Sequence, residues 1–218
     1  MIFRYNTNKK TCVILYPKKD LVKKIFSINK NFKKNEINGN LWYLKSLRSK
    51  QVKLKIASFK KNLLIVNLPL FKGKQINFWE NISFNQKYIK RVMEHYLQIW
   101  PKRKYVPFHG DLTFSNLIFG QNFKDVRIID WENFKSKNYE WGLDICYFLI
   151  SAISLPALSR KNCQIFENEK QVFKNLWQSF FLEKKFNYID NPFKYFEKKK
   201  LMKSDNFIFK IPKNMRKE

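Results

Sequence analysis

The chain has 218 residues, of which 44% are hydrophobic and 17% aromatic, so it can bury a sizeable core and is not expected to be disordered. Its formal net charge is +27, from 44 Lys and Arg against 17 Asp and Glu. Most of the basic residues are Lys and they are spread along the chain, which argues against a surface built to bind nucleic acid and favours a compositional bias.

The sequence indicates neither a signal peptide nor a membrane span. The first ten residues contain no long apolar stretch, and the longest apolar run, 145–158, is interrupted by Pro156 and is too short to cross a bilayer. Cys12, Cys146 and Cys163 are odd in number and lack the spacing of metal ligands, so we expect reduced thiols. These features predict a cytoplasmic protein.

The amino-terminal third is predicted to be mainly strands. Short apolar runs separated by the polar turns NTNKK and PKKD predict strands at residues 2–5, 12–16 and 21–26. A helix is predicted over 34–47, where Ile and Leu recur at helical spacing, and strands are predicted at 51–59 and 63–66. Pro and Gly then interrupt regular structure in the segment 67–76.

Helices are predicted to dominate the remainder, with one hairpin among them. Residues 84–100 carry a one-sided apolar stripe typical of a helix packed on a core. The apolar runs 117–119 and 126–129 flank six mostly polar residues and predict a β-hairpin. Further helices are predicted over 145–153 and 171–181, and the chain ends in a Lys-rich tail.

The hairpin is expected to bring three polar side chains to one cleft. Asp111 and Asn116 precede its first strand, and Asp130 ends its second. Residues 111–144 hold six acidic residues, whereas the first 110 residues hold four, which favours a metal-binding cleft. Transfer of a nucleotide's terminal phosphate needs a carboxylate that accepts a proton from the attacking hydroxyl, and it needs oxygen ligands for Mg²⁺. Asp111 suits the first task, and Asn116 and Asp130 suit the second.

The motif HGDLTFSN followed by IIDWE resembles that of the aminoglycoside phosphotransferase and choline kinase superfamily of small-molecule kinases. The resemblance implies an α+β, two-lobed protein-kinase-like fold. Its small antiparallel-sheet N-lobe would be residues 1–68, and its mostly helical C-lobe residues 69–218. It also implies ATP and Mg²⁺ as cofactors, Asp111 as the catalytic base, and Asn116 and Asp130 as metal ligands.

The same resemblance implies a nucleotide-binding set outside the motif. Lys24, on the third strand, would hold the phosphates, because it precedes an Ile-Phe pair as the kinase lysine precedes its apolar pair. Glu36, on the following helix, would pair with it, and a hinge that includes Asn67 and Leu68 would hold the base. The alternative is that Lys23 and Lys24 belong to a half-exposed strand and that Glu36 caps a helix.

Supporting roles are implied for three further residues. His109 is expected to brace the catalytic loop, and Asp144 to accept hydrogen bonds from its backbone, although Asp at a helix start is equally an N-cap. Glu132 could reach a second metal ion or be a solvated carboxylate. The chain departs from the family in having no glycine between the first two strands, where the turn 6–10 stands in place of a glycine-rich loop.

The sequence therefore predicts an ATP-dependent phosphotransferase with a small-molecule acceptor: an amino alcohol such as choline, a sugar or glycan precursor, or an aminoglycoside-like compound. Trp131, Phe134, Tyr139 and Trp141 could form an aromatic box for a quaternary ammonium group, although core packing would use the same residues. The alternatives are a catalytically weak or inactive kinase-like binding or scaffold protein, and a basic nucleic-acid-binding protein.

Overall fold

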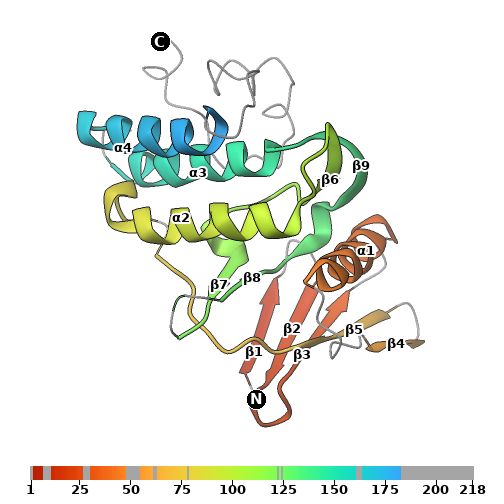
Figure 1. Ribbon diagram of the computed structural model, residues 1–218. Coiled ribbons are helices and arrows are strands. Elements are labelled where there is room, and N and C mark those ends of the chain that lie inside the picture. The colour runs from red at the N-terminus through yellow and green to blue at the C-terminus, as the bar shows by residue number, and fades with distance from the viewer. Residues whose placement is uncertain are drawn as a thin grey trace.

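The computed structural model describes residues 2–6, 11–26, 30–47, 55–60, 63–77, 79–121, 123, 125–160 and 164–182. An antiparallel sheet comes first and helices follow, which confirms the predicted α+β fold (Figure 1). The turn 7–10, which was expected to replace a glycine-rich loop, lies outside the described residues, as does Cys163. Cys12 and Cys146 are free thiols.

Five of the described strands form the amino-terminal sheet, in the spatial order β1-β2-β3-β5-β4, and every neighbouring pair is antiparallel. Their bounds are β1 Ile2–Asn6, β2 Thr11–Tyr16, β3 Leu21–Phe26, β4 Lys55–Lys60 and β5 Leu63–Pro69. A short 3₁₀ turn, η1 (Pro17–Lys19), joins β2 to β3. Pro17 presets the backbone for this turn, and Asp20 ends it in a left-handed conformation.

One helix accompanies the sheet. It is α1 (Lys30–Ser46), which lies between β3 and β4 in the chain and begins earlier than the predicted residue 34. Its side chain Ile37 packs on Phe26 and Val66 of the sheet. Its opposite contacts are with the carboxy-terminal part of the chain, chiefly with η3 (Trp131–Asn133) (Figure 1). The helix therefore joins the two parts of the fold.

In the described residues from 79 onward there are three α-helices and two small β-pairs. The helices are α2 (Ile82–Ile99), α3 (Leu143–Leu158) and α4 (Glu167–Trp177), which continues as a π-helical turn, Gln178–Leu182. The predicted hairpin is confirmed as β7 (Leu117–Phe119) and β8 (Val126–Ile128), preceded by the 3₁₀ turn η2 (Phe114–Asn116). The other pair is β6 (Tyr105–Phe108) with β9 (Lys135–Glu140).

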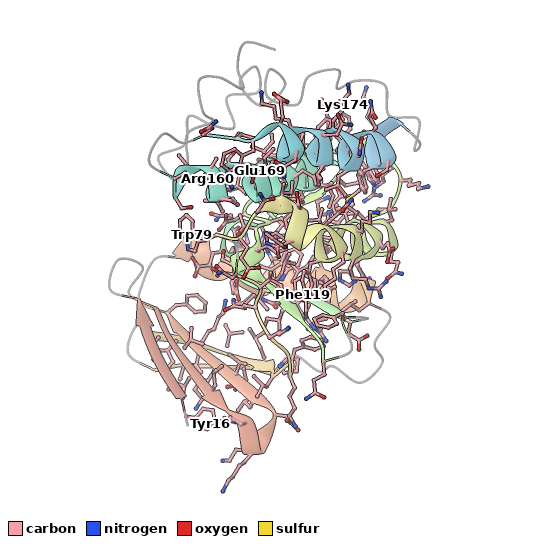
Figure 2. All side chains as sticks on the ribbon, turned by 90° about the vertical axis from the view of Figure 1, so that its left-hand side faces the viewer. Tyr16, Trp79, Phe119, Arg160, Glu169 and Lys174 are labelled. Atoms are coloured by element: carbon pink, nitrogen blue, oxygen red, sulfur yellow. The ribbon has the colours of Figure 1, made fainter. Side chains whose placement is uncertain are left out.

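The core of this part is aromatic and surrounds α3, which is buried almost throughout. Trp100, Trp131 and Trp141 are among its fully buried side chains. Arg160, just after α3, makes two ion-pair contacts of 2.6 Å with the fully buried Glu169 of α4 (Figure 2). Because a bidentate Arg–carboxylate pair fixes orientation, it holds the two helices together. No helix among the described residues is long and apolar enough to span a membrane.

Candidate active site

The loop before the β7–β8 hairpin holds Asp111 and Asn116 against each other. Asn116 Nδ2 donates to the main-chain oxygen of Asp111 at 2.7 Å and to its Oδ2 at 3.0 Å. The backbone oxygen of Asn116 accepts from Ile129 N at 2.9 Å, which ties this loop to the end of β8. Since Nδ2 is used toward Asp111, Asn116 Oδ1 is left as the available ligand atom of a side chain that lines a cavity.

Asp130 enters the same cavity from the end of β8. Its backbone is left-handed, with φ 63° and ψ 65°, a conformation that non-glycine residues rarely adopt and that often marks a functional position. Its side chain is 29% exposed, and Oδ1 lies 3.4 Å from Lys24 Nζ. Asn116 and Asp130 therefore line one cavity, while Asp111 is not among the lining residues and is joined to the cavity through its hydrogen bonds with Asn116.

Lys24 and Glu36 form a short, buried ion pair. Lys24 Nζ lies 2.6 Å from Glu36 Oε1, and Glu36 is fully buried inside α1, so it is neither a cap nor a solvated carboxylate. Burial lowers the pKa of Lys24, but the charges of Glu36, Asp130 and Glu132 and the hydrogen bond to Glu36 outweigh burial and raise that pKa above its usual value. Lys24 therefore stays positively charged at neutral pH.

The position of Glu36 is fixed by how α1 docks on the carboxy-terminal part. A Cβ placed on Gly39 would lie only 2.5 Å from the Cβ of Trp131, so the helix approaches η3 more closely than any side chain at this position allows. Asn35 Nδ2 donates to the backbone oxygen of Glu132 at 3.1 Å. Farther along the helix, the Tyr43 hydroxyl accepts from the backbone N–H of Ile128 at 3.1 Å.

Asp144, in the first turn of α3, holds the backbone of the loop that carries Asp111. Its Oδ2 accepts from His109 N at 2.9 Å and its Oδ1 from Gly110 N at 3.1 Å. The N-cap position of α3 is Gly142, so Asp144 is not the cap. Burial raises the pKa of Asp144 to about 7, against the opposing effect of these two hydrogen bonds. Gly110 has φ +85°, and a Cβ there would lie 2.8 Å from a backbone oxygen, so glycine is required.

His109 is a neutral brace within the same loop. Its Nε2 donates to the Ile129 carbonyl at 3.0 Å, and its Nδ1 accepts from Asp111 N at 3.2 Å. Burial lowers its pKa to about 4, so the ring stays uncharged at neutral pH. With both nitrogens engaged, His109 orients the loop and has no free atom with which to carry a proton.

Two further residues lie close to this cluster. Glu132 is buried and lines the cavity, and its charge contributes to the raised pKa of Lys24. Tyr147 of α3 donates its hydroxyl to Asp111 Oδ1 at 3.3 Å. Sequence reasoning missed Tyr147, because it lies in an apolar helix 36 residues beyond Asp111, where only its single hydroxyl distinguishes it from core residues.

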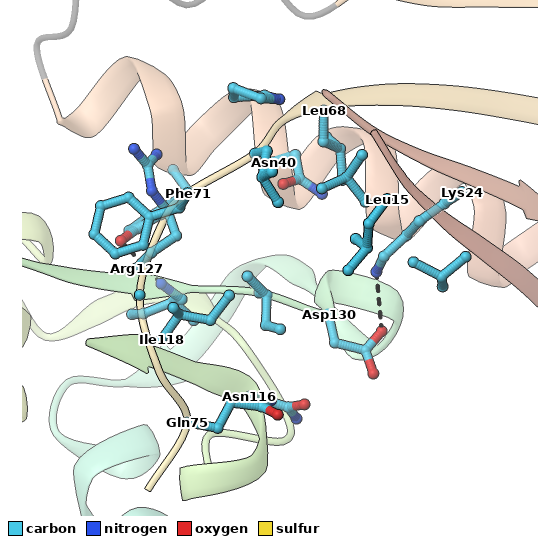
Figure 3. Close-up of a pocket in the computed structure, with 18 of the residues that line it drawn as sticks. Leu15, Lys24, Asn40, Leu68, Phe71, Gln75, Asn116, Ile118, Arg127 and Asp130 are labelled. Carbon is cyan, nitrogen blue, oxygen red and sulfur yellow. Dashed lines mark hydrogen bonds and ion pairs between the residues drawn. The ribbon is translucent and has the colours of Figure 1, made fainter. Parts of the chain in front are cut away.

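The cavity that joins these groups has a volume of about 580 Å³. Its roof comes from the sheet, its floor from the β7–β8 hairpin, and one wall from the segment after β5. Lys24 and Asp130 lie at one side, while Phe71 and Arg127 lie at the other (Figure 3). It is therefore an elongated space with a charged end and a largely apolar end.

The two residues predicted for the hinge are placed on opposite faces of the sheet. Leu68, opposite Val22, lines the cavity, whereas Asn67, opposite Lys23, does not, because successive side chains of a strand point to opposite faces. Leu70 N donates to Asp20 O at 2.8 Å, on the β3 side. Because C=O and N–H point in opposite directions across a planar trans peptide, the Pro69 carbonyl faces away from β3. Pro69, Leu70 and Phe71 all line the cavity, so the segment after β5 is the part of the predicted hinge that borders it.

The predicted aromatic box does not form. Trp131, Phe134 and Trp141 are 0%, 3% and 1% exposed and belong to the core. Tyr139 stacks on Phe108 at 4.5 Å between ring centroids. None of the four predicted box residues lines the cavity, so the alternative of core packing is the one that the structure supports.

Among the described residues, no group of three or more His, Cys, Asp or Glu is placed to hold a metal ion. Asp130 and Asn116 nevertheless offer one carboxylate and one amide oxygen to the same cavity. Mg²⁺ is commonly bound by one or two such oxygens, with phosphates and water completing its shell. The donor set therefore fits Mg²⁺ held jointly with a nucleotide.

Several solved structures align with this chain at low sequence identity. WbdD, described as a bifunctional kinase-methyltransferase, aligns at a TM-score of 0.49 and 10% identity. The alignment covers 82% of this chain and 46% of the WbdD chain, so this chain spans less than half the length of that protein. The PK-1 kinase of Cydia pomonella granulovirus aligns at a TM-score of 0.45 and 15% identity. The alignment covers 81% of this chain and 76% of the PK-1 chain. A choline/ethanolamine kinase family protein from Mesorhizobium loti aligns at a TM-score of 0.45 and 13% identity. The alignment covers 95% of this chain and 90% of that protein's chain.

None of the curated proteins matches the sequence. The family comparison gives a match over residues 27–168, which include α1, the β7–β8 hairpin and α3. This segment is well over half of the chain and contains every residue of the Asp111, Asn116 and Asp130 cluster. It agrees with the superfamily that the HGD and IIDWE motifs resemble. The chain belongs to the ecdysteroid kinase-like family.

Proposed function

We propose that this protein transfers the terminal phosphate of ATP to a hydroxyl group of a small metabolite. The observation that carries the proposal is that Lys24, Asn116 and Asp130 line one cavity, with Glu36 paired to Lys24 and Asp111 hydrogen-bonded to Asn116. Membership of a kinase-like family supports a phosphotransferase with a small-molecule substrate. Residues 1–68 and 69–218 would act as the two lobes between which the nucleotide binds.

Each charged group has a separate task in this proposal. Lys24 binds phosphate oxygens, and Glu36 holds its ammonium group in place. Asp130 and Asn116 Oδ1 supply Mg²⁺ ligands, and Glu132 is close enough to reach a second ion. Bound Mg²⁺ would neutralise charge on the phosphates and keep them aligned for attack.

Asp111 is the proposed general base. Its Oδ2 accepts from Asn116 and its Oδ1 from Tyr147, which fixes the plane of the carboxylate. A carboxylate offers about four lone-pair sites, so it can accept these hydrogen bonds and also take the proton of an acceptor hydroxyl. Asp144 and His109 keep the loop that carries Asp111 in this orientation.

The base of the nucleotide would lie at the apolar end of the cavity. The Pro69 carbonyl can accept a hydrogen bond from the exocyclic amino group of adenine. Guanine presents a carbonyl oxygen at that position, which would face another oxygen. The proposal therefore favours ATP over GTP.

A comparison of two Asp→Asn variants tests these roles. Asp111→Asn should bind MgATP as the wild type does, while turnover falls about 10²-fold or more, the usual scale for a general base. Asp130→Asn should weaken MgATP binding as well as turnover, because it removes a charged ligand from the cation. Asp125→Asn, an exposed carboxylate outside the cavity, is the matched control. Calorimetry gives MgATP affinity, and acceptor-dependent ADP release gives turnover.

The acceptor is sought with a panel of hydroxyl compounds. It contains choline, ethanolamine, sugars, aminoglycosides and, given the name of the family, a polyhydroxylated steroid. MgATP binding without phosphorylation of any compound would favour a kinase-like binding or scaffold protein. Unchanged affinity and turnover in both site variants would refute the kinase assignment. Tight, sequence-selective binding of nucleic acid at physiological salt would favour the basic-protein alternative.

A further inference from the structure

Arg127 is a cavity residue to which the proposed reaction gives no task. It lies on β8 directly opposite Ile118 of β7, and both side chains line the cavity. Its guanidinium lies between two rings, with Cζ 5.3 Å from the centroid of Phe71 and 5.8 Å from that of Tyr43. Figure 3 shows Arg127 beside Phe71, on the side of the cavity away from Lys24 and Asp130.

The guanidinium has donors without acceptors. Among the described residues, Arg127 Nε and Nη1 are closed off from solvent and have no hydrogen-bond partner. No ion pair to Arg127 is present in the described part of the chain either. Contact with two ring faces offsets part of the cost of burying a cation, but it leaves these N–H groups unsatisfied.

An apolar side chain of similar length would suit this position better if folding were its only purpose. Arg127 is only partly buried as a residue, but its Nε and Nη1 are enclosed, and replacing such unsatisfied groups by apolar ones is often neutral or stabilising. Residues that break such a local rule are commonly found at functional sites. Because Nε and Nη1 are enclosed by protein atoms, Nη2 is the guanidinium donor that remains to face a ligand in the cavity.

The position of Arg127 indicates which part of the nucleotide it meets. Phosphates are expected at Lys24 and Asp130, on the other side of the cavity. Arg127 instead contacts Phe71, which follows the hinge residue Pro69 by two positions. Its surroundings are therefore those of the base and not those of the phosphates.

We propose that Arg127 is a base-recognition residue whose Nη2 donates a hydrogen bond to a ring nitrogen of adenine. This inference rests on the proposed function and deepens it. Adenine carries an amino donor next to ring-nitrogen acceptors, so it can satisfy the Pro69 carbonyl and Arg127 together. Guanine places a carbonyl oxygen where the amino group should be, so the pair of residues discriminates against it.

The first test is Arg127→Met, which keeps an unbranched side chain between the two rings. The dissociation constant for MgATP should rise about 10-fold or more, the effect of losing one hydrogen bond from a charged donor. The affinity for magnesium tripolyphosphate, which has no base, should not change. The melting temperature should stay the same or rise, because two enclosed N–H groups without acceptors are removed. Arg91→Met, at a surface ion pair on α2, controls for the loss of one positive charge.

The second test uses ATP analogues that lack single ring nitrogens: 1-deaza-, 3-deaza- and 7-deaza-ATP. One of the three should bind the wild type about 10-fold more weakly than ATP, and that difference should disappear in Arg127→Met. MgGTP should also bind the wild type at least about 10-fold more weakly than MgATP.

The outcomes separate this inference from the function on which it rests. If Arg127→Met melts at a lower temperature and binds MgATP as the wild type does, Arg127 only braces the hinge against α1, and the inference is wrong. It is equally wrong if all three analogues bind the wild type like ATP. If the wild type binds neither MgATP nor magnesium tripolyphosphate, the proposed function itself fails.

Discussion

Replacing Gly39 by Ala should test whether α1 is held in place by its contact with η3. The added Cβ would lie 2.5 Å from Trp131 Cβ and 2.9 Å from its Cγ and Cε3. Ordinary contact begins near 3.4 Å, so helix and turn must separate by about 0.9 Å. Alanine gains about 1 kcal/mol in helix propensity, whereas overpacking costs about 1–3 kcal/mol. We expect a net loss of up to about 2 kcal/mol.

The same displacement should reach the candidate site. Glu36 lies one turn before Gly39 on the same helix, and its Oε1 is 2.6 Å from Lys24 Nζ. A shift of about 0.9 Å would stretch this contact to as much as about 3.5 Å, beyond the usual 2.7–2.9 Å of a charge-assisted hydrogen bond. Lys24 would then be less firmly held for the phosphates. We expect MgATP affinity to fall about 10-fold.

Asn38→Ala is the matched control, because Asn38 lies on the exposed side of the same helix and also gains helix propensity. Thermal unfolding should place Gly39→Ala several degrees below the control, at about 2–4 °C per kcal/mol for a chain of this size. Calorimetry with MgATP measures the second effect. If Gly39→Ala is as stable as Asn38→Ala and binds MgATP equally well, the argument that Gly39 sets the position of Glu36 is refuted.

Two further predictions concern protons. Burial, with the charges of Arg91 and Arg127, lowers the pKa of His95 from 6.5 to about 4. Between pH 6.5 and pH 4 the unfolded chain therefore binds more protons than the folded chain, and the free energy of unfolding falls as the pH falls. Urea titration should show that the free energy of unfolding falls by about 2 kcal/mol less in His95→Gln than in the wild type between pH 7 and pH 5. An equal fall in both proteins would contradict the lowered pKa of His95. Tyr147→Phe should lower turnover several-fold, leave MgATP affinity unchanged and move the acid limb of the pH–rate profile to higher pH, because the Asp111 carboxylate loses a donor. An unmoved profile would show that the contact is only packing.

The elements that the sequence predicts well are those with a strong local signal. The β7–β8 hairpin follows from two apolar runs around a polar turn, and β1 to β3 follow in the same way. The spacing of Asp111, Asn116 and Asp130 is also local, since all three lie within one loop and one hairpin. The placement of Asn116 and Asp130 at one cavity, with Asp111 bound to Asn116, could therefore be predicted before any long-range contact was known.

Features that depend on packing between distant segments could not be predicted. Tyr147 reaches Asp111 only because α3 packs beneath the loop, and Arg127 meets Phe71 only through the pairing of the two parts of the fold. Which of Asn67 and Leu68 faces the cavity depends on the register of β3 with β5. Local periodicity carries no information on these contacts.

The docking of α1 has a consequence for how the cavity can open. The hydrogen bonds from Asn35 to Glu132 and from Ile128 to Tyr43, with the close approach at Gly39, join α1 to the carboxy-terminal part. Its described link to the sheet is the packing of one side chain, Ile37, together with the Lys24–Glu36 pair. A relative movement of the sheet would therefore leave α1 behind and break that ion pair. Phosphates bound by Lys24 would oppose such a movement, so nucleotide binding and closure of the cavity should be coupled through this one lysine.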